Sequence, residues 1–131
     1  SYETGEGVGQ DFAMAAKWFR KSAYQSDADA QASLGHLYET GKGVVQDYTV
    51  AAKWYRRSAD QGNAIGQYYL GAMYKTGRGV ALDYAQAHMF WTLAARQGDE
   101  DAIGARDSLA LLMSTEQIAE SEKLTRDWKS K

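Results

Sequence analysis

Few side chains in this chain can take part in acid–base, nucleophilic or metal chemistry. The 131 residues include no cysteine, which excludes a thiol nucleophile, a disulfide scaffold and a cysteine-ligated metal. The two histidines, His36 and His88, fall in different parts of the pattern described below and are not expected to meet. No serine has a paired histidine and aspartate in a known catalytic order. We therefore predict no catalytic residue, no metal site and no cofactor, so the chain is not expected to be an enzyme.

Two other patterns resemble ligand sites only superficially. The glycine-rich run at residues 5–9 has the glycine content of a nucleotide loop, but no Gly-Lys-Ser/Thr ending follows and no strand precedes it. Acidic residues gather at Asp27 and Asp29, and again at residues 99–101. Both groups stand at predicted helix starts, where negative charge complements the helix dipole. We interpret both patterns as structural.

Basic residues form a ribbon with a regular spacing. Its members are Lys17, Arg20, Lys21, Lys53, Arg56 and Arg57. A ribbon of this kind can contact phosphates, but the net charge is −2 and acidic residues balance it elsewhere. We interpret it as a solvated outer face and expect no nucleic-acid partner. The apolar runs are too short to cross a bilayer, so we expect no membrane insertion.

These side chains are positioned by an internal repeat. Tyr2, Tyr38 and Tyr74 are 36 residues apart, and many other columns keep this register. Residues 38–61 share 16 of 24 positions with residues 2–25, and 10 of 24 with residues 74–97. Repeats of this length indicate stacked structural units, because one unit cannot bury its apolar face alone.

Each unit is predicted to be a hairpin of two helices. Gly41 follows the last residue of one helical pattern, as expected for a left-handed cap. Asp47 then caps a second helix, whose apolar residues recur at helical spacing. Gly35 and Gly71 lie within first helices and indicate close approach of a second helix. We expect the aromatic that fills this space to come from one column: Trp18, Trp54 and Phe90.

The two ends of the chain differ from its middle. Residues 1–25 are predicted to hold a glycine loop and one second helix, followed by units at 26–61 and 62–97. Residues 98–131 are predicted to form a capping helix pair with Ser114 as a helix cap. Its buried stripes are expected at Ala102, Arg106, Leu109 and Leu112, and at Ile118, Ser121, Leu124 and Trp128. The fold class is therefore all-α, an α/α superhelix of about seven helices.

Residues 64–80, together with the pattern from Asp47 to Gly62, resemble the signature of the Sel-one-like repeat (SLR) family. The resemblance covers nearly the whole chain. It implies an α-solenoid related to tetratricopeptide repeats, a right-handed superhelix whose concave face contacts other proteins. It also implies bacterial members that are often periplasmic or secreted. The location of this chain is unknown, and a cytoplasmic one stays open.

Three functions are compatible with this resemblance. The first is a non-catalytic scaffold that binds a protein or peptide through the concave face. The second is a β-lactam-linked hydrolase or small-molecule binder, as in the cysteine-rich subset of the family, although this chain lacks those cysteines. The third is a passive structural spacer in an envelope protein. We predict the first, with a partner whose identity is unknown.

The binding residues are expected in columns that vary between units. Positions 29, 33, 36 and 40 and their mates are spaced by 4, 3 and 4, which places them on one face of each first helix. Tyr69 is the best single candidate because tyrosine anchors interfaces well. The predicted concave-face set is Tyr69, His36, Ser33, Ile65, Ala72, Glu39, Lys75 and Asp101. An alternative is that Tyr69 only packs against the neighbouring unit.

The first helix is expected to leave an apolar face uncovered, around Phe12, Ala16 and Phe19. Such a face favours self-association through this end of the chain.

Overall fold

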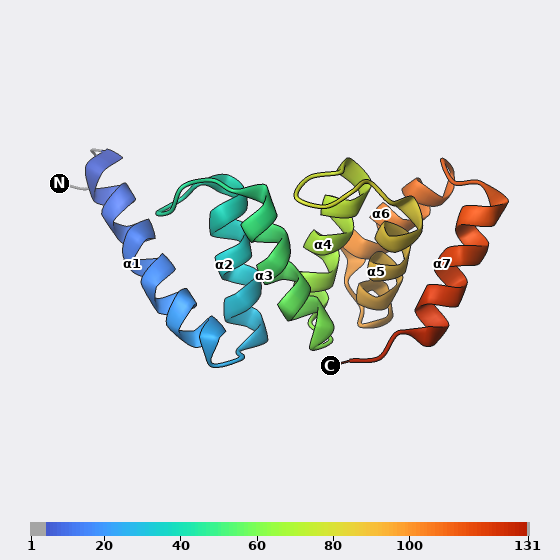
Figure 1. The fold of residues 1–131 in the computed structure, drawn as a ribbon, viewed down its shortest axis with the longest axis horizontal. Helices are drawn as coiled ribbons and strands as arrows, with labels where there is room; N and C mark the ends of the chain where they lie inside the picture. Colours follow the sequence, from blue (N-terminus) through green and yellow to red (C-terminus); the bar gives the residue numbers. More distant parts are fainter. Residues whose placement is uncertain (1–4, 131) are drawn as a thin grey trace.

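A computed structural model describes residues 5–130, and these residues form seven α-helices and no strand. The helices are α1 (Gly5–Tyr24), α2 (Ala28–Thr40), α3 (Tyr48–Asp60), α4 (Ala64–Thr76), α5 (Tyr84–Arg96), α6 (Glu100–Ala110) and α7 (Thr115–Asp127). They follow one another along the molecule's long axis, with α1 at one end and α7 at the other (Figure 1). The all-α solenoid is confirmed. The repeat columns at Tyr2 and Thr4 lie outside the described residues.

The predicted caps start and stop the helices. The side chain of Asp47 accepts a hydrogen bond from the Val50 amide, and Asp83 does the same for Gln86. Gly41 and Gly77 end α2 and α4 in the left-handed conformation, with φ of 73° and 70°. Ser114 forms a complete capping box at the start of α7. The turns between helices are thus set by local chemistry.

One aromatic ring in each unit fills the space above a helix glycine. A Cβ on Gly35 would lie 2.8 Å from the ring of Tyr55, and one on Gly71 would lie 2.5 Å from Nε1 of Trp91. The close approach is confirmed, but the predicted column of Trp54 and Phe90 is wrong by one position. Position 54 lies about 100° further round the helix, so its ring points away from the glycine.

Trp54 instead packs against α2 of its own unit and α1 of the preceding one. It is 7% exposed and shares a core cluster with Ala23, Ala30 and Leu34. Trp18, its mate one repeat earlier, is 63% exposed. The prediction of a buried Trp18 is therefore wrong, because no described helix occupies the place that α1 and α2 take beside Trp54.

The buried side chains of Gln31 and Gln67 are each hydrogen-bonded within their own unit and to the last helix of the preceding unit. Gln61 donates through Nε2 to Oε1 of Gln31, and Gln97 donates to Gln67, both at 2.9 Å. Gln31 also donates to the Ala23 carbonyl. This repeated bonding satisfies buried amides that would otherwise destabilise the core.

The first helix differs from its prediction in two ways. It begins at Gly5, so the glycines at residues 5–9 are helical and form no loop. The Gly41 amide donates to the Leu37 carbonyl at the end of α2, whereas Gly5, its mate one repeat earlier, is the first residue of α1. The exposed apolar residues of α1 are Met14 and Trp18. The expected face at Phe12, Ala16 and Phe19 is covered, with Ala16 2% exposed and the two phenylalanines partly buried.

The last helix packs along α5 and not along α6. The reason lies on the outer surface of α5, where Met89 and Leu93 stand in the columns of Lys53 and Arg57. Helix α7 covers this apolar surface, and its Ser121 hydroxyl lies 2.6 Å from Nδ1 of His88. Burial lowers the pKa of His88 below its usual value, with a further contribution from Arg106.

The predicted stripes of the last two helices are confirmed in part. Ala102, Leu109 and Ser121 are buried. Leu112 is 64% exposed, and Arg106, Ile118, Leu124 and Trp128 are only partly buried. The stripe on α6 therefore ends one turn earlier than its spacing indicates. No helix in residues 5–130 is both long and apolar enough to cross a membrane.

The two tryptophans of one repeat column give a matched test of this packing. Trp54→Ala should lower the free energy of unfolding by roughly 3–5 kcal/mol, because it removes a buried aromatic side chain. Trp18→Ala should lower it by less than about 1 kcal/mol, since its ring is already in solvent. Chemical denaturation of both variants measures the difference, and equal losses would contradict the assignment of Trp54 to the core.

Candidate functional site

A pocket opens where α2 and α4 lie beside each other. Its volume is about 300 Å³. The residues that line this α2–α4 pocket are Phe19, Ala32, Ser33, His36, Leu37, Ile65 and Tyr69. Four of them, Ser33, His36, Ile65 and Tyr69, belong to the predicted concave-face set. The spacing of the variable columns thus brings half of that set to one place.

Tyr69 is the centre of the pocket's aromatic wall. Its ring stacks on Tyr55 at 5.1 Å between centroids and meets Tyr68 edge-on at 5.3 Å. The imidazole of His36 lies 5.5 Å from it on the pocket side. The ring of Tyr69 is partly buried against the core. The same residue also lines the pocket, so part of it is accessible from the surface. The alternative, that Tyr69 only packs against the neighbouring unit, accounts for its core contacts but not for its position in the pocket lining.

Hydrogen bonds beneath the pocket hold this wall in place. Tyr55 donates from its hydroxyl to Oε1 of Glu39 at 2.6 Å. Burial is the main reason that the pKa of Tyr55 is raised, and the bond to Glu39 raises it further. The Tyr55 phenol therefore stays protonated and keeps its ring fixed under Tyr69. Glu39 has a supporting role here and does not line the pocket.

The remaining predicted residues lie away from the pocket lining. Ala72 is partly buried against the cluster around Trp91. Lys75 and Asp101 are exposed on α4 and α6. Burial raises the pKa of Tyr68, and the negative charge of Asp101 adds to this shift.

Three pocket residues were missed by the sequence reasoning: Phe19, Ala32 and Leu37. Phe19 occupies the same repeat column as Tyr55 and Trp91, the column that fills the glycine spaces. That aromatic column was the signal that could have identified it. Ala32 and Leu37 resemble ordinary core positions, and both are buried under the pocket floor.

The pocket combines an apolar floor with a few polar atoms. Ile65 is 50% exposed at the rim. Nδ1 of His36 is buried and has no hydrogen-bond partner among residues 5–130, which is uncommon for a buried polar atom. No group of three or more acidic, histidine or cysteine side chains that could hold a metal occurs in this described part. The arrangement suits an apolar side chain with one hydrogen-bonding group.

The folded chain is a helical repeat solenoid with an open pocket between consecutive first helices. The Sel1 repeat model matches it three times, at residues 1–27, 28–63 and 64–99. The chain belongs to the Sel1 repeat family, whose members are generally non-catalytic scaffolds for protein interactions.

Solved structures give the same fold. A protective antigen present in uropathogenic Escherichia coli strains, which displays an SLR fold, is 32% identical with a TM-score of 0.85. That match covers 88% of this chain but only 25% of the antigen, so the chain spans a quarter of its length. A search of the curated proteins finds no match.

Two shorter proteins are also similar. A Sel1 repeat protein from Oxalobacter formigenes is 39% identical, with a TM-score of 0.68, over 70% of this chain and 69% of that one. The cysteine-rich protein B of Helicobacter pylori is 30% identical, with a TM-score of 0.65, over 69% and 68%.

Alanine substitutions at two tyrosines distinguish a core residue from a residue of the pocket wall. Tyr55→Ala should cost roughly 3–5 kcal/mol of unfolding free energy, because the ring is fully buried against Gly35. Tyr69→Ala should cost about 1–2 kcal/mol, since it loses ring contacts on one side only. Thermal and urea melts of the two variants compare them, and a Tyr69→Ala loss as large as that of Tyr55→Ala would make Tyr69 a core residue.

Proposed function

We propose that the chain is a non-catalytic interaction module that binds a protein or peptide through the face of α2 and α4, the predicted concave face. The observation that carries this proposal is the α2–α4 pocket with Tyr69 at its centre. Its floor is preformed by core packing, so binding requires little ordering of the protein. We also propose how the chain is divided into repeats. It holds a partial unit at 1–25, full units at 26–61 and 62–97, and a terminal helix pair at 98–131.

The pocket fits one apolar side chain of the partner. A volume of about 300 Å³ is at the lower end for small-molecule sites, and the pocket is open to solvent. Ile65 and Tyr69 supply an apolar and aromatic contact of the kind that dominates interface energetics. Nδ1 of His36 offers an acceptor or donor according to its tautomer.

The alternative functions receive less support. The chain has no cysteine, so the activity linked to the cysteine-rich subset is not proposed for it. A passive spacer would need no open pocket with an unpartnered polar atom. The absence of enzymatic activity stays part of this proposal.

A random peptide library selected on the purified chain tests the proposal. Selected peptides should bind at least about tenfold more weakly to Ile65→Lys, because a charged side chain at the rim opposes burial of an apolar residue. Ile103→Lys is the matched control, since Ile103 is 37% exposed on α6 and lies outside the pocket. Its affinity should stay within about twofold of the original.

Two results would count against this site. One is a library that yields no binder for the unmodified chain. The other is a set of binders that tolerate Ile65→Lys as well as Ile103→Lys, which would place their contact elsewhere.

Self-association is a separate part of the proposal. Met14 and Trp18 are 60% and 63% exposed and one helical turn apart on α1, an apolar pair suited to contact with a second copy. Light scattering should show a concentration-dependent rise in mass that Trp18→Lys abolishes. A monomer at every concentration would rule this contact out.

A further inference from the structure

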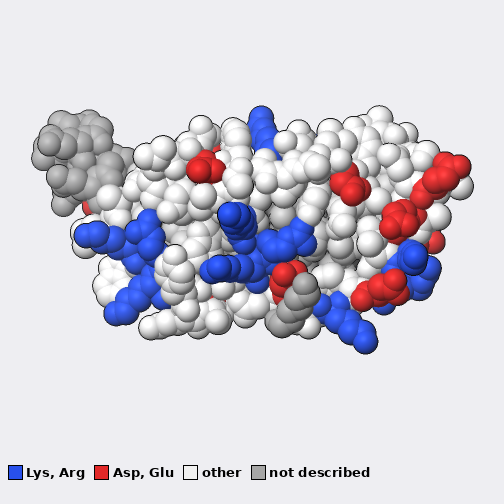
Figure 2. All heavy atoms as spheres, viewed as in Figure 1, with Lys and Arg blue, Asp and Glu red and all other residues white. Residues whose placement is uncertain are grey.

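A second surface, on the second helices, carries a regular set of cations. We call it the outer basic face: Lys17, Arg20 and Lys21 on α1, with Lys53, Arg56 and Arg57 on α3. Figure 2 shows lysine and arginine side chains gathered over these two helices, while acidic side chains concentrate toward the α7 end. Both lysines of α1, and Lys53 and Arg57 of α3, are exposed.

The cations of this face are held by identical contacts in the two units. Arg20 donates to the Tyr38 hydroxyl at 3.1 Å, and Arg56 donates to the Tyr74 hydroxyl. One position further on, Arg57 lies over the Trp54 ring at 4.7 Å, as Lys21 lies over that of Trp18 at 5.7 Å. Side chains that are already ordered lose less entropy when they bind an anion.

The structure records no ion pair within the described residues that includes a cation of this face. The ion pair that the structure records between residues 5–130 joins Arg106 and Asp107 on α6. The face therefore presents a local positive potential on a protein whose net charge is −2.

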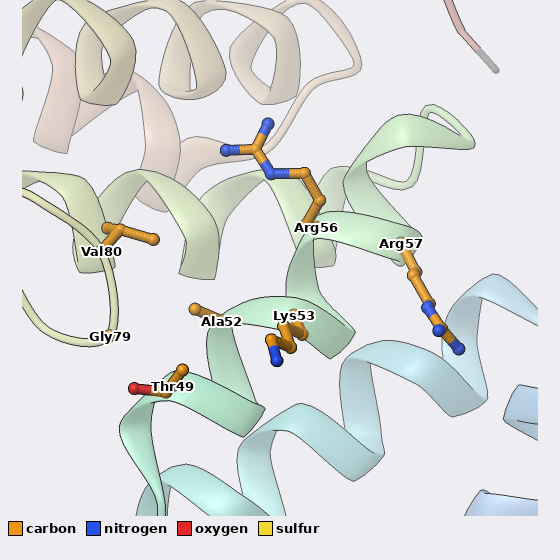
Figure 3. A pocket seen from close by; sticks show the side chains of 7 residues that line it. All are labelled: Thr49, Ala52, Lys53, Arg56, Arg57, Gly79 and Val80. Carbon is orange, nitrogen blue, oxygen red and sulfur yellow. The ribbon is translucent and has the colours of Figure 1, made fainter.

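A cavity of about 300 Å³ lies between α3 and the loop that follows α4. It is lined by Thr49, Ala52, Lys53, Arg56, Arg57, Gly79 and Val80. Figure 3 shows Val80 on the loop across from Ala52, with Arg56 and Arg57 extending to opposite sides of α3. The lining thus joins apolar contacts from Ala52 and Val80 with a hydroxyl and three cationic side chains.

The third unit shows what replaces this face where it is covered. Met89, Thr92 and Leu93 stand in the columns of Lys53, Arg56 and Arg57, and Met89 and Leu93 are 4% and 8% exposed beneath α7. Two of these three columns are apolar on α5 beneath α7, and all three are cationic on α1 and α3. The cations therefore mark open surface in this array.

We propose that the outer basic face is a docking surface for an acidic segment of a protein partner. The carboxylates of the segment pair with the cations of α1 and α3, and one aliphatic side chain enters the cavity beside Ala52 and Val80. The apolar contacts favour a peptide over a nucleic acid, because a sugar–phosphate backbone offers nothing to bury there. This site is separate from the α2–α4 pocket, and the proposal does not depend on binding at that pocket.

The test is fluorescence anisotropy with a labelled peptide rich in glutamate and containing two leucines, at about 0.15 M salt, where weak surface attraction is screened. The same peptide with glutamine in place of glutamate is the neutral probe. The acidic peptide should bind the unmodified chain at least about tenfold more tightly than the neutral one.

Charge reversal locates the contact. Lys17→Glu combined with Lys53→Glu changes one exposed lysine on each helix and should weaken acidic-peptide binding at least about tenfold. Lys123→Glu combined with Arg126→Glu makes the same change of net charge at two exposed positions on α7 and should leave the affinity within about twofold. Thermal melts establish that both variants fold.

Three results would overturn the proposal. Equal losses in the two double variants would show attraction to net charge without a defined surface. Equal binding of the acidic and neutral peptides would remove the role of the cations. Tighter binding of a single-stranded oligonucleotide of matched charge, lost on reversal of Lys17 and Lys53, would assign the face to nucleic acid.

Discussion

The structure depends on one steric constraint, the seating of an aromatic ring against a helix glycine within each hairpin. Tyr55 lies over Gly35 and Trp91 over Gly71, so closely that a methyl group at either glycine would overlap the ring. Each ring is also hydrogen-bonded to the first helix, Tyr55 to Glu39 and Trp91 to the Tyr68 carbonyl at 2.8 Å. This contact sets how near the two helices lie, and the stacking of units follows from it.

Because the framework is confined to a few columns, two surfaces stay free to vary. The first helices present the α2–α4 pocket, whose wall is Tyr69 supported by the framework ring of Tyr55. The second helices present the outer basic face, whose arginines are themselves bonded to framework tyrosines. Both surfaces rest on the same repeated contacts. The proposed binding at either surface would therefore use a shape that the fold already provides.

Much of the fold was predictable from local signals. The 36-residue period follows from comparing the sequence with itself. The left-handed glycines at 41 and 77 and the caps at Asp47 and Ser114 depend only on neighbouring residues. The meeting of Ser33, His36, Ile65 and Tyr69 in one pocket was also predictable, because helical spacing places them on one face.

The remaining features depend on contacts between distant elements. Two adjacent aromatics, Trp54 and Tyr55, are equally suited in type to fill a glycine space, and only the packing direction of α3 separates them. The path of α7 was missed because the apolar surface of α5 attracts it more than α6 does. Phe19 was assigned to an uncovered face, although α2 packs on α1 and makes it part of the pocket.

The most direct test of the central claim is an NMR titration of the isotope-labelled chain with a library-selected peptide. The account predicts that the largest amide shifts fall on α2 and α4, around Ser33, His36, Ile65 and Tyr69, and that Ile65→Lys removes them. Shifts that instead concentrate on α5, α6 or α7 and survive Ile65→Lys would contradict it.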